Sequence, residues 1–298
     1  MGSGDAGPGV SGGTIAMIVG IDERLSGADT DVDADRARRV LGGVRPSGRA
    51  DARAAFREVD GAFLLVLGAG IGTAVVTVLS TVNRLLATQP VATYGFFFGL
   101  IAASAAVLLG AVDLSTPRRK AAAVAGFALA FLASGIAATT LGSPLPVVFV
   151  AGGVAVSAMV LPGISGSLLL IVLGQYEYMS GVVSRLVDGL GALAVGDGAD
   201  GIVETLPPVA AFLLGGLGGL FTIAHAVRYA LSRARAATLA FLVSLIVGAL
   251  RAPLVETTGI LAESGESWRA AAPRFALAAL VGAVAVLVLD RYSAAIEY

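Results

Sequence analysis

Two short stretches of the chain combine proline, glycine and hydroxyl side chains in the same order. The first is Pro-Gly-Val-Ser-Gly-Gly-Thr at residues 8–14, the second is Pro-Gly-Ile-Ser-Gly-Ser at residues 162–167, and an apolar run follows each of them. Free backbone N–H groups, hydroxyls and the positive end of a helix dipole together bind anions, phosphates above all. We therefore expect an anion site built from both stretches. Its candidate residues are Gly9, Ser11, Gly12, Gly13, Thr14, Gly163, Ser165, Gly166 and Ser167.

The composition is that of a membrane protein. Of the 298 residues, 56% are hydrophobic and 14% are charged, and the mean hydropathy is +0.87. Soluble domains carry about 25% charged residues. The chain has no cysteine and one histidine, His225, so we expect neither a metal centre nor a thiolate nucleophile, and no cofactor. A net charge of −1 gives no indication of a nucleic-acid partner.

The apolar runs predict an all-α polytopic membrane protein. A helix needs about 20 residues to cross the hydrocarbon core. Residues 26–59 are polar and charged, so we place them outside the bilayer, and shorter apolar pieces (8–25, 147–161 and 167–184) flank the two motifs. The runs that are long enough, or nearly so, are 61–83, 91–113, 121–141, 208–229, 236–250 and 273–290.

The short apolar pieces beside each motif predict a re-entrant helical hairpin. Irregular backbone survives at membrane depth only where protein or a wet cavity surrounds it. Pro8 and Pro162 lack an N–H and interrupt a continuous helix, while the glycines permit a tight turn. Each motif is therefore expected at the tip of a hairpin that enters the membrane and returns.

The two halves of the chain predict an inverted repeat. Residues 93–104 are similar to 238–249, and the glycine-rich 68–72 is similar to 215–219. Each half then consists of a hairpin and three spans. Because three is odd, the second half must be inverted, as in many secondary transporters. We expect a first repeat at 1–141, with a truncated first hairpin, and a second repeat at 142–298.

Charge predicts which loops face the cytoplasm. The short 228–236 loop has three arginines and no acid, whereas the loops at 185–205 and 252–272 are acidic. Short loops rich in arginine and lysine stay on the cytoplasmic side of the membrane. We therefore expect the 26–59 loop and the C-terminus in the cytoplasm. A second hairpin that is instead a single broken crossing gives the same total of basic residues on each side, so the total leaves that alternative open.

The first motif in its context, MGSGDAGPGVSGGTIAMIVGIDERL, resembles the opening signature of the polyprenyl-phosphate (undecaprenyl-phosphate type) transporter family, formerly a domain of unknown function. Residues 161–176 and 96–104 resemble further segments of that family. Family members usually have a hydrophobic helix before the signature, and Asp22 stands where they have tyrosine. The signature positions are filled by Met1, Gly2, Asp5, Pro8 to Thr14, Gly20, Glu23, Arg24 and Leu25.

The resemblance implies a plasma-membrane translocase. Its cargo is expected to be polyprenyl phosphate, the carrier lipid of cell-envelope assembly, moving from the outer leaflet back to the cytoplasmic one. The protein then binds the anionic head, and the tail stays in lipid.

Ionisable residues beside the hairpins are the further candidates. Arg24 is able to hold a phosphate in a bidentate fork, and its alternative role is to reach the cytoplasmic interface or to pair with Glu23. Asp5 or Glu23 is a candidate for carrying a coupling ion, with helix capping or an ion pair as the alternative. Glu177 is a third coupling candidate, although Tyr176 and Tyr178 beside it are also typical of an interface belt.

Other functions are compatible with paired anion-binding helix ends. A small-anion secondary transporter or channel would use the same groups. An integral-membrane enzyme acting on a lipid phosphate is the remaining class, but the sequence shows no histidine pair, no cysteine and no clustered acids to support it. The sequence does not set the oligomeric state.

Overall fold

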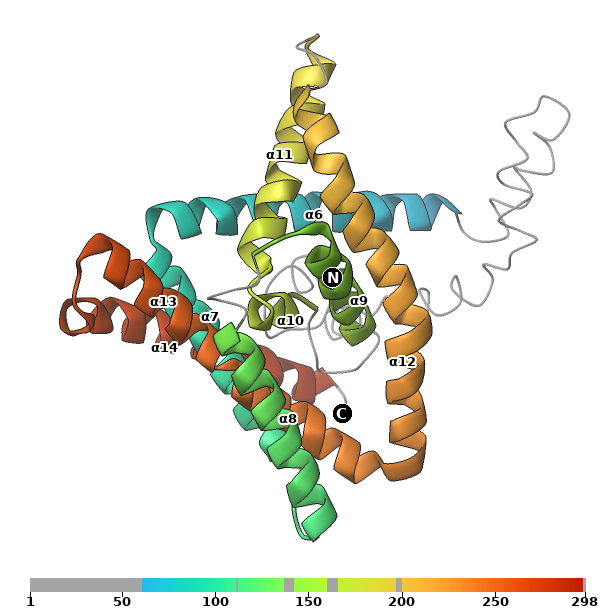
Figure 1. Ribbon diagram of the computed structural model, residues 1–298, viewed down its shortest axis with the longest axis vertical. Helices are drawn as coiled ribbons and strands as arrows, with labels where there is room; N and C mark the ends of the chain where they lie inside the picture. Colours follow the sequence, from blue (N-terminus) through green and yellow to red (C-terminus); the bar gives the residue numbers. More distant parts are fainter. Residues whose placement is uncertain (1–60, 111, 137–141, 160–165, 197–199, 297–298) are drawn as a thin grey trace, which may run out of the picture.

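The chain folds into helices only over the part that the structure describes. The computed structural model describes residues 61–110, 112–136, 142–159, 166–196 and 200–296. No strand occurs in these ranges, and Figure 1 shows the helices crossing around α9 and α10. The helices are α6 (Gly61–Thr88), α7 (Pro90–Leu109), α8 (Pro117–Ile136), α9 (Leu145–Met159), α10 (Gly166–Val172), α11 (Tyr176–Ala194), α12 (Asp200–Ala249), α13 (Arg251–Ser264) and α14 (Trp268–Ile296).

Four helical stretches among the described residues are long and apolar enough to cross a bilayer, by length and composition. They are Leu65–Thr88, Pro90–Leu109, Gly201–Ser264 and Trp268–Tyr292. The third covers 64 residues, about three times the length of one span, and its backbone breaks at Ala234, where φ is −152° and ψ is 55°. The prediction of an all-helical, multi-pass membrane protein is confirmed.

Two element boundaries differ from those expected. The apolar piece 167–184 is divided into α10 and α11, because Gly174 takes a left-handed φ of 64° that ends α10. The acidic segment 252–272 was expected as a loop, but most of it forms α13, which ends at Gly265 with φ 70°. Pro253 is tolerated there because the first turn of a helix has no intrahelical partner for its N–H.

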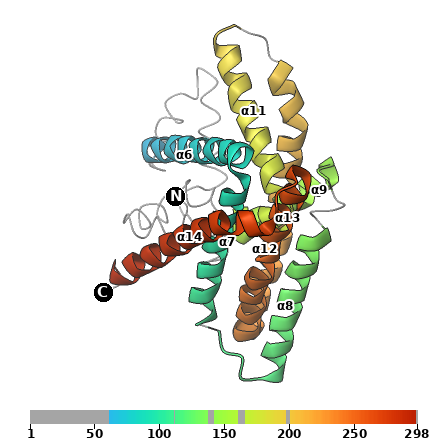
Figure 2. The same cartoon turned by 90° about the vertical axis from the view of Figure 1, so that its left-hand side faces the viewer.

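Helix α7 lies at the centre of the molecule. In its membrane-span window 61% of the residues are buried, against 6% in that of α6. Phe97 and Ile101 are almost fully enclosed, and the ring of Phe97 meets Tyr176 of α11 edge-on at 5.5 Å between centroids. Figure 2 shows α6 and α14 extending from this centre to the same side of the molecule.

Glycines allow the helix backbones to touch in two long packing contacts. A Cβ on Gly99 of α7 would lie 1.8 Å from the carbonyl oxygen of Ala279 of α14. A Cβ on Gly126 of α8 would lie 2.1 Å from the carbonyl oxygen of Phe241 of α12. Small residues at such contacts let membrane helices approach closely, where dispersion and weak hydrogen bonds hold them together. The contacts join α7 to α14 and α8 to α12.

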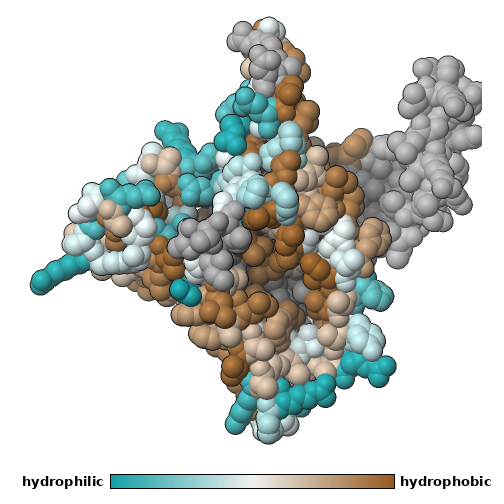
Figure 3. Space-filling view, in the orientation of Figure 1, coloured by the Kyte–Doolittle hydropathy of each residue, from teal (hydrophilic) through white to brown (hydrophobic). Residues whose placement is uncertain are grey.

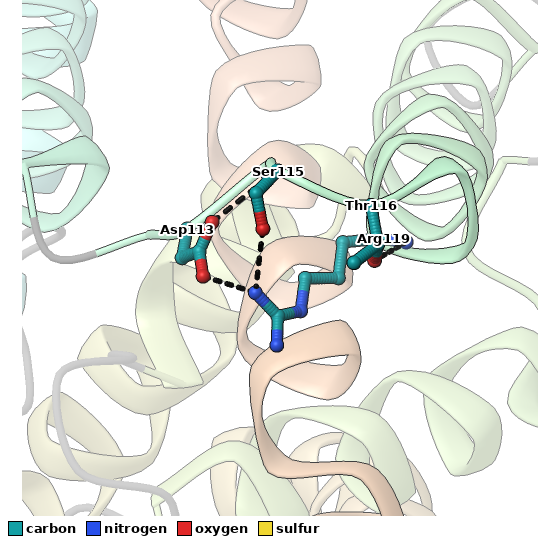
Figure 4. Close-up of polar contacts among 4 residues, drawn as sticks. All are labelled: Asp113, Ser115, Thr116 and Arg119. Atoms are coloured by element: carbon teal, nitrogen blue, oxygen red, sulfur yellow. Dashed lines mark hydrogen bonds and ion pairs between the residues drawn. The ribbon is translucent and has the colours of Figure 1, made fainter.

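The connection between α7 and α8 is an ordered cap (Figure 4). The Ser115 N–H donates to Asp113 Oδ1 at 2.8 Å, and Arg119 Nη1 donates to Asp113 Oδ2 and, at 3.1 Å, to Ser115 Oγ. These contacts, the Ser115 N–H first, hold the pKa of Asp113 below its ordinary value. Thr116 precedes Pro117, the arrangement favoured at a helix start, and its Oγ1 accepts the Arg119 N–H at 3.4 Å.

Polar and apolar side chains separate along the molecule. Figure 3 shows hydrophobic side chains across the centre of this face and hydrophilic ones at its ends. The start of α8, with Arg118, Arg119 and Lys120, and the bend of α12 at Ala234, beside Arg233 and Arg235, lie at the same end in both views (Figures 1 and 2). These two basic segments therefore lie close to one end of the molecule.

Replacing Gly99 with alanine should destabilise the protein, because the new Cβ must push α14 away from α7. Overpacking of this kind lowers the free energy of unfolding by about 1–3 kcal/mol. The matched change is Gly68→Ala in α6, where a Cβ meets nothing within 4 Å. Gly68→Ala should leave the free energy of unfolding equal to that of wild type or slightly higher. Unfolding of the purified variants in one detergent measures both, and equal midpoints for the two variants would contradict the packing argument.

Candidate functional site

Most of the predicted site residues lie outside the residues that the structure describes. Gly166 and Ser167 begin α10 and are buried, and Glu177 lies in the first turn of α11. The first motif and the ionisable residues around it are not described. The residues concerned are Asp5, Gly9, Ser11, Gly12, Gly13, Thr14, Glu23, Arg24, Gly163 and Ser165.

The helices on either side of the second motif pack against each other. Helix α9 leads into the motif, α10 leaves it, and the two are in contact. Ala158, near the end of α9, and Leu169 of α10 belong to one apolar cluster with Ala249 of α12. Residues 160–165 therefore link two helix ends that both lie within the packed bundle.

Gln175 connects the segment after α10 to the segment before α9. Its side chain is 1% exposed, and Nε2 donates to the carbonyl of Gly142 at 2.9 Å and to that of Leu173 at 3.4 Å. Gly142 precedes α9 and Leu173 follows α10. A residue after α10 thus lies within hydrogen-bond distance of a residue before α9. Gln175 Oε1 has no partner within the described part of the chain.

A cavity of about 730 Å³ lies between α7, α11 and α13. We call it the acidic cavity because Glu177, Glu256 and Glu263 line it and no arginine or lysine does among its described lining residues. The hydroxyl of Tyr94, which also lines it, donates to Glu177 Oε2 at 3.3 Å. Carboxylates without cationic partners attract cations and repel phosphate. This cavity is therefore suited to a proton rather than to an anion.

Glu177 is held where α11 starts. Acidic side chains are stabilised in the first turn of a helix by the helix dipole, and the Ser180 hydroxyl donates to the Glu177 carbonyl at 2.9 Å. Tyr176 beside it is 4% exposed and packs on Phe97, so the expectation of an interface belt is wrong for Tyr176. Within the described residues, no group of three or more acidic or histidine side chains is placed to hold a metal ion.

Arg251 lies at the break between α12 and α13, near the hairpin. Its Nη1 donates to the Phe131 carbonyl at 2.7 Å, and its Cζ lies 4.3 Å from the centre of the Phe131 ring. A Cβ on Gly135 would lie 2.6 Å from the guanidinium, so the arginine side chain would have to shift if a larger residue stood there. A cation beside the last turn of α8 is stabilised by the carbonyls of that helix end.

Sequence reasoning missed Tyr94, Gln175, Arg251 and Glu256. Tyr94 lies within the segment 93–104, which was noticed only as a repeat. Glu256 was assigned to the loop at 252–272. Arg251 lies between that loop and the apolar run 236–250, and an arginine next to a long apolar run already indicates an ionisable group at the membrane. For Gln175 the signal was its position, directly after the glycine that ends the second motif's helix.

Comparisons with known proteins agree over most of the chain. A family model described as undecaprenyl phosphate translocase-like matches residues 1–268. A curated relative from Vibrio cholerae, named polyprenyl-phosphate transporter, is 32% identical over 251 residues, which is 84% of this chain and 73% of the relative. No solved structure matches the chain.

The hydrogen bond in the acidic cavity can be tested with Tyr94→Phe. Phenylalanine keeps the ring against Phe97 and removes only the hydroxyl that meets Glu177. The free energy of unfolding should fall by about 1 kcal/mol. Tyr292→Phe, on the exposed part of α14, is the control and should change nothing. Unfolding in detergent compares the two, and an unchanged Tyr94→Phe would mean that the bond contributes no stability.

Proposed function

Because the chain belongs to the undecaprenyl phosphate translocase-like family, we propose that it is a translocase that returns polyprenyl phosphate from the outer to the cytoplasmic leaflet of the plasma membrane. It does so without a catalytic step. The observation that carries the proposal is the packing of α9 against α10, together with the Gln175–Gly142 hydrogen bond that joins the segment after α10 to the one before α9. It supports a re-entrant element with the second motif at its turn.

The phosphate head binds to the two motifs together. Helix α10 has only seven residues, so its dipole alone is too weak to hold a phosphate, and several backbone N–H groups and hydroxyls must converge. Ser11, Thr14 and Ser165 supply hydroxyls, the motif glycines supply N–H groups, and Arg24 supplies charge. Arg251, which follows Ala249 by two residues and contacts the Phe131 carbonyl of α8, is a further candidate guanidinium.

The two halves, 1–141 and 142–298, are inverted repeats in this proposal. The glycine contacts support it, since Gly126 of α8 packs on the Phe241 carbonyl and Gly282 of α14 packs on the Phe96 carbonyl. Phe96 and Phe241 hold the same place in the similar segments 93–104 and 238–249. Both glycines follow a Pro-Arg pair by nine residues, at 117–118 and 273–274. The third span of each half thus packs against the second span of the other half.

The head then moves between leaflets when the two repeats alternate around it. The basic segments at 118–120 and 228–235 lie at one end of the molecule and support a common cytoplasmic face (Figure 1), which also holds the 26–59 loop and the C-terminus in this proposal. Transport is ion-coupled. Glu177 in the acidic cavity carries the coupling cation, and Asp5 and Glu23 are the further candidates.

Bulky substitutions in the motifs test the head-group site. Ser11→Phe and Ser165→Phe should each abolish movement of polyprenyl phosphate across proteoliposomes, because they fill the turn where the phosphate binds. Ser232→Phe, on the exposed side of α12, should transport normally. Reconstituted protein is quantified in each sample. Transport at the normal rate by both motif variants would reject the proposed site.

Glu177→Gln tests the coupling role. The amide keeps the size of the side chain and removes its titration, so a proton gradient should no longer accelerate transport, while binding of polyprenyl phosphate at equilibrium stays within about twofold. Glu266→Gln at the exposed connection between α13 and α14 is the control and should keep the gradient response. A gradient response that survives in Glu177→Gln assigns the coupling to another group.

A further inference from the structure

A second cavity lies directly beside the second motif. It has a volume of about 300 Å³ and is enclosed by α6, α9, α10, α11 and α12. We call it the apolar cavity, because aliphatic and aromatic side chains such as Val75, Leu79, Val183 and Phe212 form most of its wall. Gly166 and Ser167, the last two residues of the second motif, also line it.

The apolar cavity opens toward the surroundings of the molecule at α12. Leu213 lines the cavity and is also 58% exposed, and its neighbour Leu214 is 60% exposed. In a span of this hydropathy such side chains face lipid. One end of the cavity therefore adjoins the motif, and another wall adjoins the hydrocarbon of the bilayer.

We propose that the apolar cavity binds the isoprenoid units next to the phosphate of the transported lipid. The inference rests on the proposed function and deepens it, since it assigns protein contacts to a tail that otherwise stays in lipid. A phosphate at the motif would bring its first carbons to Gly166 and Ser167, which line the cavity. A branched hydrocarbon fits the wall chemically, because burial of apolar surface is favourable and the wall offers almost no polar partner.

The volume limits how much of the tail is bound. Ligand pockets run from about 300 to 1,000 Å³, so this one lies at the lower end and holds only the head-proximal part. The remaining units pass Leu213 into the bilayer. The same geometry favours a lipid phosphate over inorganic phosphate, since inorganic phosphate has no hydrocarbon to contact the cavity wall.

The test is to fill the cavity from α11 with Val183→Trp and to measure binding by the full-length chain in lipid nanodiscs. The probes are undecaprenyl phosphate, farnesyl phosphate and inorganic phosphate. We expect wild type to bind both lipid phosphates more tightly than inorganic phosphate. Val183→Trp should weaken both by about tenfold, the loss expected when roughly two methylene groups lose apolar contact, and should leave inorganic phosphate unchanged.

Two further variants make the result decisive. Leu190→Trp, also on α11 but 51% exposed and outside the cavity wall, should bind all probes as wild type does. Leu79→Trp fills the cavity from α6 and replaces Val183→Trp if that variant does not fold. Normal lipid-phosphate binding by the cavity variants overturns the tail site while the proposed function stands. Equal binding of inorganic and lipid phosphates by wild type overturns the proposed function itself.

Discussion

Backbone N–H and C=O groups at membrane depth must find their partners inside the protein, because hydrocarbon offers none. The interruptions of the helices here are arranged under that constraint. At the turn after α10, the Gln175 N–H donates to the Leu170 carbonyl at 2.8 Å, and its side chain satisfies Gly142. At the break before α13, the Arg251 side chain reaches the Phe131 carbonyl near the end of α8. The Gln175 side chain thus supplies the partner of a backbone carbonyl that lies outside the helices.

The same interruptions place polar and ionisable side chains at the centre of a bundle that is otherwise apolar. Successive residues of a helix point about 100° apart, so the first turn of α11 presents Glu177 to the acidic cavity and Tyr176 to the apolar one. One short helical segment therefore separates a cavity suited to a cation from a cavity suited to hydrocarbon.

The sequence was sufficient for the all-helical, multi-pass class and for a helix after the second motif, because both depend on local composition. It was insufficient for the acidic cavity, because Tyr94 and Glu177 are 83 positions apart and meet only through packing of α7 and α11. Helix α13 was missed for a different reason. Its acids and threonines have the composition of a loop. Thr257, however, is fully buried and donates its hydroxyl to the Pro253 carbonyl. The hydroxyl is therefore satisfied by the backbone of its own helix.

Glycine patterns in the two halves show why similar sequences need not make the same contact. The pattern at 215–219 packs closely on α9, where a Cβ on Gly215 would lie 1.8 Å from the Phe149 carbonyl. In the similar 68–72 of α6, a Cβ on any of the glycines meets nothing within 4 Å among the described residues. Glycine permits helices to approach but supplies no attraction of its own. The contact forms where a partner helix is brought alongside, and for 215–219 that partner is α9, which packs along α12.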